Sequence, residues 1–295
     1  MGRVSPNVYK ILAQEADEFS RTKKQIGQIS SNGWTVVDNS YDHDRKRPFR
    51  SSNFKGVLYE KDGQYALAFP GTDGFNLKDW GTNLKMGLTG HSKQSDLAKE
   101  FAENMMDKYN LNADNTVSLG ASEGGHEATQ VGIKNGLPTF TYNAWGVRKN
   151  DYPGNYDDLV TNYRDPHDPV SKVKQNVGKT YVVPNNQGWF KSKTPFGSID
   201  AHRIQNMGDL DQAIPVEEYK KQHPLFFDHI SDAEITREDI AMMEPEIFSI
   251  YENEIDERMK NNQIRSNSDL EELMRRMGVL SQRPVNGFYR RVTYV

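Results

Sequence analysis

The segment Gly-Ala-Ser-Glu-Gly at residues 120–124 constrains the fold of this 295-residue chain more than any other feature. It follows an apolar run at residues 116–119 and precedes a segment of helical composition at residues 125–135. A G-x-S-x-G pattern between a strand and a helix is typical of a tight, strained turn, which pushes the serine hydroxyl outward. The pattern therefore predicts that Ser122 is a nucleophile. Because glycine and serine are common, a glycine-rich turn with an unused serine is the alternative.

Strand-like and helix-like segments alternate along the chain before residue 205. Two β-rich runs, residues 54–59 and 64–69, flank an Asp-Gly turn and predict a hairpin. An opening hairpin followed by alternating strands and helices predicts an α/β fold with a mostly parallel central sheet and helices on both faces. The expected helices are residues 7–20, 93–109 and 125–135, and the further expected strands are residues 34–37, 116–119, 139–142, 159–163 and 180–183.

The last third of the chain has a different character. Residues 235–262 are acidic and rich in methionine, with apolar residues at helical spacing. A capping box, Ser268-x-x-Glu271, precedes a second apolar helical pattern. We therefore expect residues 1–210 to form the sheet domain and residues 211–295 a helical C-terminal extension, which packs on that domain or on a partner.

Composition excludes several classes of protein and site. The formal net charge is -4, which does not favour nucleic-acid binding. The chain has no cysteine, so disulfides, thiolate metal sites and cysteine nucleophiles are excluded. We expect no cofactor and no metal. No signal peptide or membrane-spanning run of about 18 apolar residues is visible. The expected location is therefore the cytoplasm, or the outside of the cell after export by a signal-independent route.

The residues that would activate Ser122 occur in the required order. In this architecture a carboxylate follows the serine, and a histidine follows the carboxylate. Asp168 lies just past the strand expected at 159–163, and His202 follows the strand expected at 180–183. Asp165 competes with Asp168, and either aspartate could instead cap a turn. His202 alone could be a surface histidine, but the order of all three predicts a Ser122–Asp168–His202 triad.

Two backbone N–H groups are candidates for binding an oxyanion. The residue after the nucleophile, Glu123, supplies the first in this architecture. A loop after an earlier strand supplies the second, and Thr72 in the sequence Phe-Pro-Gly-Thr at residues 69–72 is placed for it. A simple Pro-Gly turn is the alternative for that loop.

The same residues resemble a known family. Residues 69–72, followed by Asp-Trp-Gly-Thr-Asn-Leu at residues 79–84, resemble the F-R-G-T…D-W-x-x-D-L stretch of class 3 (fungal-lipase-like) α/β-hydrolases. Residues 118–125 resemble their G-H-S-L-G-G elbow, and the segments at 162–170 and 198–207 resemble the Asp and His segments of bacterial lipase-like members. The resemblance covers residues 7–210. It implies an α/β-hydrolase fold, the same triad and oxyanion donors, and a lid at residues 75–91.

The chain departs from that family beside the nucleophile. Ala121 and Glu123 stand where the lipases carry His and Leu, and Pro70 and Asn83 replace their Arg and Asp. None of these changes removes a catalytic group. A charge at Glu123 is less expected beside a triacylglycerol than beside a phospholipid or a soluble ester.

The sequence therefore predicts a serine hydrolase that cleaves acyl esters, with lipids as the expected substrates and peripheral contact with a membrane. One alternative is a phospholipase toxin or effector whose C-terminal helices, residues 235–280, bind a delivery or immunity partner. Another is a hydrolase-fold binding protein without activity, which the presence of Ser122, Asp168 and His202 disfavours.

Overall fold

The described part of the chain forms one eight-stranded sheet with helices on both faces. The structure is a computed structural model that describes residues 4–41, 54–71, 93–147, 151–166, 168, 170–172, 176–183, 201–222, 253, 255–261 and 263. The strands are β1 (Thr35–Asn39), β2 (Val57–Lys61), β3 (Gln64–Phe69), β4 (Thr116–Ala121), β5 (Thr139–Tyr142), β6 (Val160–Arg164), β7 (Lys179–Val182) and β8 (Ile214–Pro215). The α-helices are α1 (Pro6–Phe19), α4 (Lys93–Tyr109), α5 (Glu123–Asn135) and α8 (Val216–Gln222), and short 3-10 helices include η1 (Lys23–Gln25), η3 (Val170–Lys172), η4 (Ile204–Asn206) and η5 (Leu210–Gln212).

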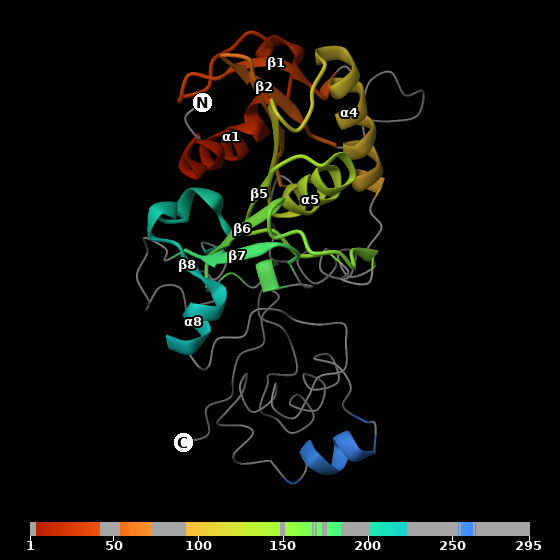
Figure 1. Ribbon diagram of the computed structural model, residues 1–295, viewed down its shortest axis with the longest axis vertical. Coiled ribbons are helices and arrows are strands. Elements are labelled where there is room, and N and C mark those ends of the chain that lie inside the picture. The colour runs from red at the N-terminus through yellow and green to blue at the C-terminus, as the bar shows by residue number, and fades with distance from the viewer. Residues whose placement is uncertain are drawn as a thin grey trace.

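The strands lie side by side in the order of the sequence (Figure 1). The pairs from β3 to β7 are parallel, whereas β1, β2 and β8 join the sheet antiparallel. Asp62 and Gly63 have φ of 53° and 75° in the turn between β2 and β3, which is the geometry of a tight hairpin. The predicted hairpin and mostly parallel α/β sheet are therefore confirmed.

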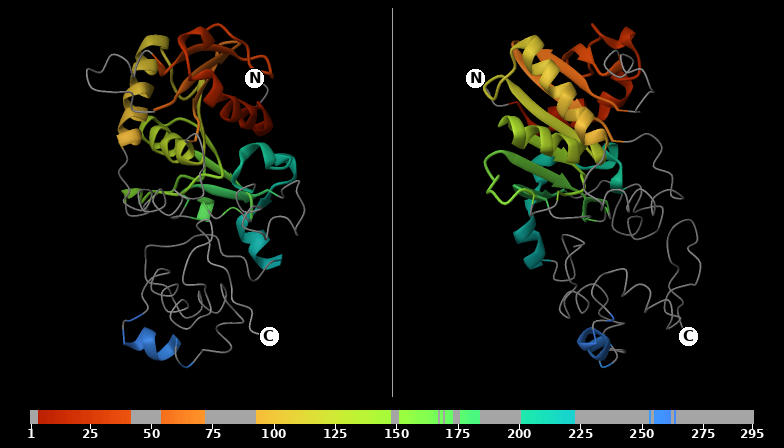
Figure 2. Two further views of the ribbon diagram at one scale, coloured as in Figure 1. Left: turned by 180° about the vertical axis from the view of Figure 1, so that it is seen from behind. Right: turned by 90° about the vertical axis from the view of Figure 1, so that its right-hand side faces the viewer.

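Two hydrophobic cores lie on the two faces of the sheet, because successive side chains of a strand point to opposite faces. On β3, Ala66 and Ala68 contribute to the core beneath α1, whereas Leu67 and Phe69 contribute to the core beneath α4 and α5. Figure 2 shows α4 and α5 together on one side of the sheet and α1 on the other. The prediction of helices on both faces is confirmed.

The parallel strands bring four polar or small positions to one edge of the sheet. β3, β4, β5 and β6 end at Phe69, Ala121, Tyr142 and Arg164. Since parallel strands share a direction, the residues that follow them lie at the same edge. This edge carries Gly71, Ser122, Asn143 and Asp165.

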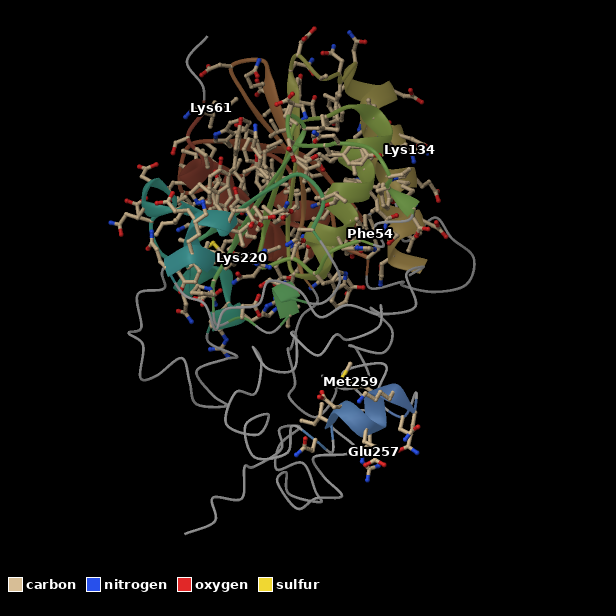
Figure 3. The ribbon with its side chains drawn as sticks, turned by 60° about the horizontal axis from the view of Figure 1, so that its bottom comes forward. Phe54, Lys61, Lys134, Lys220, Glu257 and Met259 are labelled. Atoms are coloured by element: carbon tan, nitrogen blue, oxygen red, sulfur yellow. The ribbon has the colours of Figure 1, made fainter. Side chains whose placement is uncertain are left out.

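The fold continues past residue 210. β8 pairs with β7, and α8 follows it directly. Residues 255–260 are helical, in agreement with the helix expected at 235–262, and Glu257 and Met259 lie on them (Figure 3). The division of the chain at residue 210 stays a prediction, because most of the proposed extension lies outside the described residues. Within the described ranges, no helix is long and apolar enough to cross a membrane.

Candidate active site

Ser122 is the single residue between β4 and α5, and it forms a strained turn. Its backbone has φ 55° and ψ -126°, a conformation that residues with a side chain rarely adopt. A side chain on Gly124 would overlap the backbone of Phe69, and one on Gly120 would overlap the backbone of Gly124. The glycines of the motif are therefore required by close backbone contacts. The Ser122 N–H donates to the carbonyl of Tyr142 at 3.0 Å, which fixes the turn against β5.

Asp168 is fully buried in the turn after β6, and its carboxylate accepts several hydrogen bonds. The N–H groups of Val170 and Ser171 donate to its two oxygens at 2.9 and 3.1 Å. Asp168 thus caps η3, as the alternative reading of the sequence expected. The same bonds hold both oxygens of the carboxyl group in a fixed orientation.

His202 bridges the aspartate and the serine. Its Nδ1 lies 3.0 Å from Asp168 Oδ1, and its Nε2 lies 2.9 Å from Ser122 Oγ. Because the Asp168 carboxylate accepts, Nδ1 carries the proton and Nε2 is free to accept from the serine hydroxyl. The side chain is 7% exposed, so the imidazole lies in a mostly desolvated site. The structure brings together the three residues that the sequence pointed to.

Asp165, the competing carboxylate, has a different environment. It is buried, and its backbone N–H donates to Asn143 Oδ1 at 2.8 Å. Of the two aspartates, Asp168 is the one hydrogen bonded to the ring of His202.

Of the two predicted oxyanion donors, Glu123 lies within the described part of the chain and Thr72 does not. Glu123 is the first residue of α5. The N–H groups of a helix's first turn point beyond its N-terminus and not to carbonyls within it. Thr72 and the predicted lid at 75–91 lie outside the described residues. Gly71, which precedes Thr72, approaches the nucleophile so closely that a Cβ on it would lie 2.9 Å from Ser122 Cβ.

The helix that follows the nucleophile buries two further titratable side chains. The Nδ1 of His126 lies 3.0 Å from the carbonyl of Gly146, and its Nε2 lies 2.7 Å from the side-chain nitrogen of Gln130. His126 thus packs in the structure beside the site. Burial, and to a smaller extent the charge of Glu123, raises the pKa of Glu127 well above its usual value. The remaining histidines, His43, His91, His167, His223 and His229, lie outside the described residues.

Sequence reasoning missed one buried polar residue at this edge of the sheet. Asn143 follows β5, is 1% exposed and contacts the segments that carry both Asp165 and His202. Its position directly after an apolar strand, at the same edge as Ser122, is the signal that could have found it.

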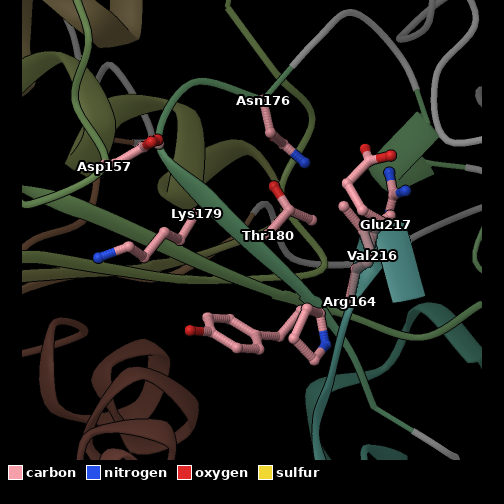
Figure 4. A pocket seen from close by; sticks show the side chains of 10 residues that line it. Asp157, Arg164, Asn176, Lys179, Thr180, Val216 and Glu217 are labelled. Atoms are coloured by element: carbon pink, nitrogen blue, oxygen red, sulfur yellow. The ribbon is translucent and has the colours of Figure 1, made fainter. Parts of the chain in front are cut away.

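A cavity of about 430 Å³ lies elsewhere, between β6, β7 and the start of α8 (Figure 4). Charged side chains of both signs line it, among them Arg164, Lys179, Asp157 and Glu217. None of Ser122, Asp168 and His202 is among the residues that line it. In the described part of the chain, no group of three or more His, Asp or Glu side chains is arranged to hold a metal ion.

Comparison with known proteins identifies a relative and a family. The chain is 25% identical over 182 residues to an extracellular phospholipase A1 of Serratia liquefaciens. The match covers 53% of this chain and 55% of that relative, so the chain spans about half the relative's length. The comparisons support a phospholipase-like hydrolase, whereas membership of the class 3 branch stays a prediction. Residues 12–191, more than half of the chain, match the Tle-like phospholipase domain, so the chain belongs to this phospholipase-like family.

Proposed function

We propose that this chain is a serine hydrolase that cleaves a carboxylic ester bond of phospholipids through Ser122, His202 and Asp168. The observation that carries the proposal is the position of His202 between Ser122 Oγ and Asp168 Oδ1, at 2.9 and 3.0 Å. Both distances are within the reach needed for proton transfer. This geometry also favours an active enzyme over a hydrolase-fold protein without activity.

The proposed mechanism follows from the hydrogen bonds. His202 Nε2 takes the proton of the Ser122 hydroxyl as its oxygen attacks the ester carbonyl, and returns that proton to the leaving alcohol. Asp168 holds the Nδ1–H tautomer and stabilises the imidazolium. The Glu123 N–H and a donor at Thr72 bind the oxyanion. Water, activated by His202, then releases the acyl group from Ser122.

The substrate assignment rests on two arguments. The family is phospholipase-like, and one relative is a phospholipase A1. The carboxylate of Glu123 adjoins the nucleophile in sequence, and a charged group there suits a zwitterionic or cationic head group better than a triacylglycerol. We therefore propose phospholipids as substrates, with release of the sn-1 acyl chain as in a phospholipase A1.

Replacing the nucleophile tests the activity directly. Purified protein is incubated with phosphatidylcholine and triacylglycerol in matched mixed micelles, and released fatty acids are identified by mass spectrometry. Wild type is expected to release the sn-1 acid from the phospholipid and to react with a fluorophosphonate probe. Ser122→Ala should do neither, because it removes the hydroxyl that attacks the ester and the probe. Release that persists in Ser122→Ala would contradict the proposal.

The two aspartates provide a matched pair for the role of Asp168. Asp168→Asn is expected to lower kcat on the order of 10⁴-fold, because the amide favours the wrong imidazole tautomer. Asp165→Asn removes a buried carboxylate three residues away and should lower kcat far less. Equal losses in the two variants, both checked for folding by circular dichroism, would remove Asp168 from the triad.

A second candidate is a phospholipase effector that binds a protein partner through residues 235–280. The acidic, methionine-rich composition of that stretch favours it, since methionine-rich faces suit adaptable protein contacts. Expression of the enzyme on each side of a bacterial inner membrane tests it. We expect cells to stop growing when the enzyme is directed to one side of this membrane, and to grow normally when it carries Ser122→Ala. Normal growth with the wild-type enzyme on either side would exclude an effector of this kind.

A further inference from the structure

Asn143 occupies the centre of the sheet edge that carries the proposed triad. It directly follows β5, which lies between β4, the strand before Ser122, and β6, the strand before Asp168. Its backbone has φ 47°, a left-handed conformation that asparagine tolerates better than other residues with a side chain. Its N–H donates to the carbonyl of Tyr163 at 2.9 Å, which extends the β5–β6 pairing by one residue.

The side chain of Asn143 uses both ends of its amide. Its Nδ2 donates to the backbone carbonyls of Ala201 and His202, at 2.8 and 3.0 Å. Its Oδ1 accepts the N–H of Asp165 at 2.8 Å. The amide is buried, so leaving these groups unpaired would cost about 1–3 kcal/mol for each of them. The contacts therefore hold two separate segments in one arrangement.

Those two segments carry the base and the carboxylate. The carbonyl of Asp165 accepts the N–H of Asp168 at 3.2 Å, so the turn that Asn143 holds is the turn that presents Asp168. On the other side, Asn143 binds the backbone of His202 itself. The imidazole of His202 contacts Ser122 Oγ at 2.9 Å and Asp168 Oδ1 at 3.0 Å. It can keep both contacts only if the backbone of His202 is held in position.

We propose that Asn143 is the positioning residue of the active site: its side-chain amide ties the Asp168 turn to the His202 backbone and thereby sets the distance across the triad. This inference rests on the proposed function. Asn143 acts through His202 and Asp168 and does not itself contact the reacting atoms. Asparagine is suited to the position because it combines two donors, one acceptor and tolerance of positive φ.

The neighbouring strand supplies a matched control. Asn162 on β6 is also buried, its Nδ2 donates to the carbonyls of Val177 and Lys179 at 2.9 and 3.1 Å, and its Oδ1 accepts from Thr141 Oγ1 at 2.7 Å. It therefore also uses its amide as a double donor and as an acceptor, but its partners are Val177, Lys179 and Thr141 and not the triad segments. A substitution at Asn162 reports the general cost of losing a buried amide.

The experiment compares Asn143→Gly, Asn143→Asp and Asn162→Asp in the full chain. Asn143→Gly keeps the positive φ and removes the amide, whereas Asn143→Asp keeps the acceptor and loses the amide donors. We expect both Asn143 variants to lower kcat on the order of 100-fold with KM unchanged, because a small misplacement of a catalytic group costs about that much. Asn162→Asp should change kcat far less at a similar loss of thermal stability.

A spectroscopic readout makes the test independent of activity. We expect the proton between His202 Nδ1 and Asp168 to give a far-downfield resonance in proton NMR, which Asp168→Asn would assign by removing it. We expect this resonance to shift or vanish in both Asn143 variants and to persist in Asn162→Asp. If it persists in folded Asn143→Gly and kcat equals that of Asn162→Asp, the inference is wrong.

Two further outcomes are also decisive. If wild type shows the downfield resonance but hydrolyses no ester, the proposed function fails, and the NMR comparison alone decides the role of Asn143. If both Asn143 variants unfold while Asn162→Asp folds, Asn143 holds the whole fold and not the triad in particular, which overturns the inference.

Discussion

At the scale of single residues, Ser122 combines a strained backbone with a fixed neighbourhood. A residue with a side chain in this sparsely populated region costs about 1–3 kcal/mol. The bond from its N–H to Tyr142, and the backbone contacts at Gly120 and Gly124, hold the turn in place. The hydroxyl is presented to His202 as a result. Strain at this position is thus part of the arrangement that the proposed chemistry uses.

Glu127 leads to a prediction about pH and stability. Its pKa is raised in the folded protein, first by burial and then by the charge of Glu123, so the folded state keeps a proton that the unfolded chain releases. Its contribution to the free energy of unfolding is therefore fully present below the ordinary pKa of a glutamate and is lost as the pH rises through the raised value.

We expect Glu127→Gln to become more stable relative to wild type as the pH rises from below the ordinary pKa of a glutamate into the alkaline range, because the buried carboxyl of wild type must then lose its proton. Chemical denaturation at several pH values measures the difference. Asp114→Asn, which removes an exposed charge, serves as the control for net charge. A difference between Glu127→Gln and wild type that does not change with pH would contradict the expectation.

The site was partly predictable from the sequence. Ser122, Asp168 and His202 follow strands in a fixed order, and parallel strands bring such positions to one edge, so their meeting could be anticipated. Asp168 was preferred to Asp165 for its place after the strand and for the family resemblance, but strand order alone leaves both open, because the outcome depends on which carboxylate of one short turn contacts the imidazole. Asn143 was missed for a related reason: its role lies in bonds to residues far away in the sequence.

At the scale of elements, three tyrosines form a ladder across β5, β6 and β7. Tyr142, Tyr163 and Tyr181 are direct register partners, and their rings stack with centroids 5.9 and 5.7 Å apart. Burial is the first cause that raises the pKa of Tyr163 to about 12. The stacked rings pack β5, β6 and β7 together just before Asn143 and Asp165. The edge of the sheet that carries the candidate site is therefore next to a well-packed layer of side chains.

Element prediction succeeded where local chemistry decides the structure. The Asp-Gly turn fixed the hairpin of β2 and β3, and helical periodicity located α1 and α4. β8 was missed because it has two residues, Ile214 and Pro215, and no periodicity can be read from so short a strand. It forms because β7 offers a free edge in the folded sheet, which is a tertiary cause.

At the scale of the whole molecule, the N-terminal helix holds the segment that follows His202. Lys10 Nζ donates to the carbonyls of Met207 and Gly208 at 3.1 and 2.8 Å, and Asn7 Oδ1 accepts the N–H of Leu210 at 3.2 Å. Leu210 is buried in the core beneath α1. The segment after His202 is therefore part of the same core as α1.

Truncating the buried side chain of Leu210 should destabilise the core beneath α1. Leu210→Ala is expected to lower the free energy of unfolding by about 2–3 kcal/mol, since it leaves a cavity in the core. Ile29→Ala serves as the control, because Ile29 is 67% exposed and its loss should cost less than about 0.5 kcal/mol. Urea denaturation of both variants measures the difference. Similar midpoints for the two would show that residues 207–210 do not contribute to this core.

The contact between α1 and the segment after His202 also has a consequence for biosynthesis. Asn7 and Asp209, which share a hydrogen bond, are 202 residues apart in the chain, and Ser122 precedes His202 by 80 residues. Translation runs from the N-terminus at about 5–20 residues per second, and domains fold as units. At that rate Ser122 is made several seconds before His202, and α1 is made longer still before the segment at Asp209 that it contacts. The proposed triad therefore cannot assemble until His202 has been made, although the strand and the helix that flank Ser122 are complete long before.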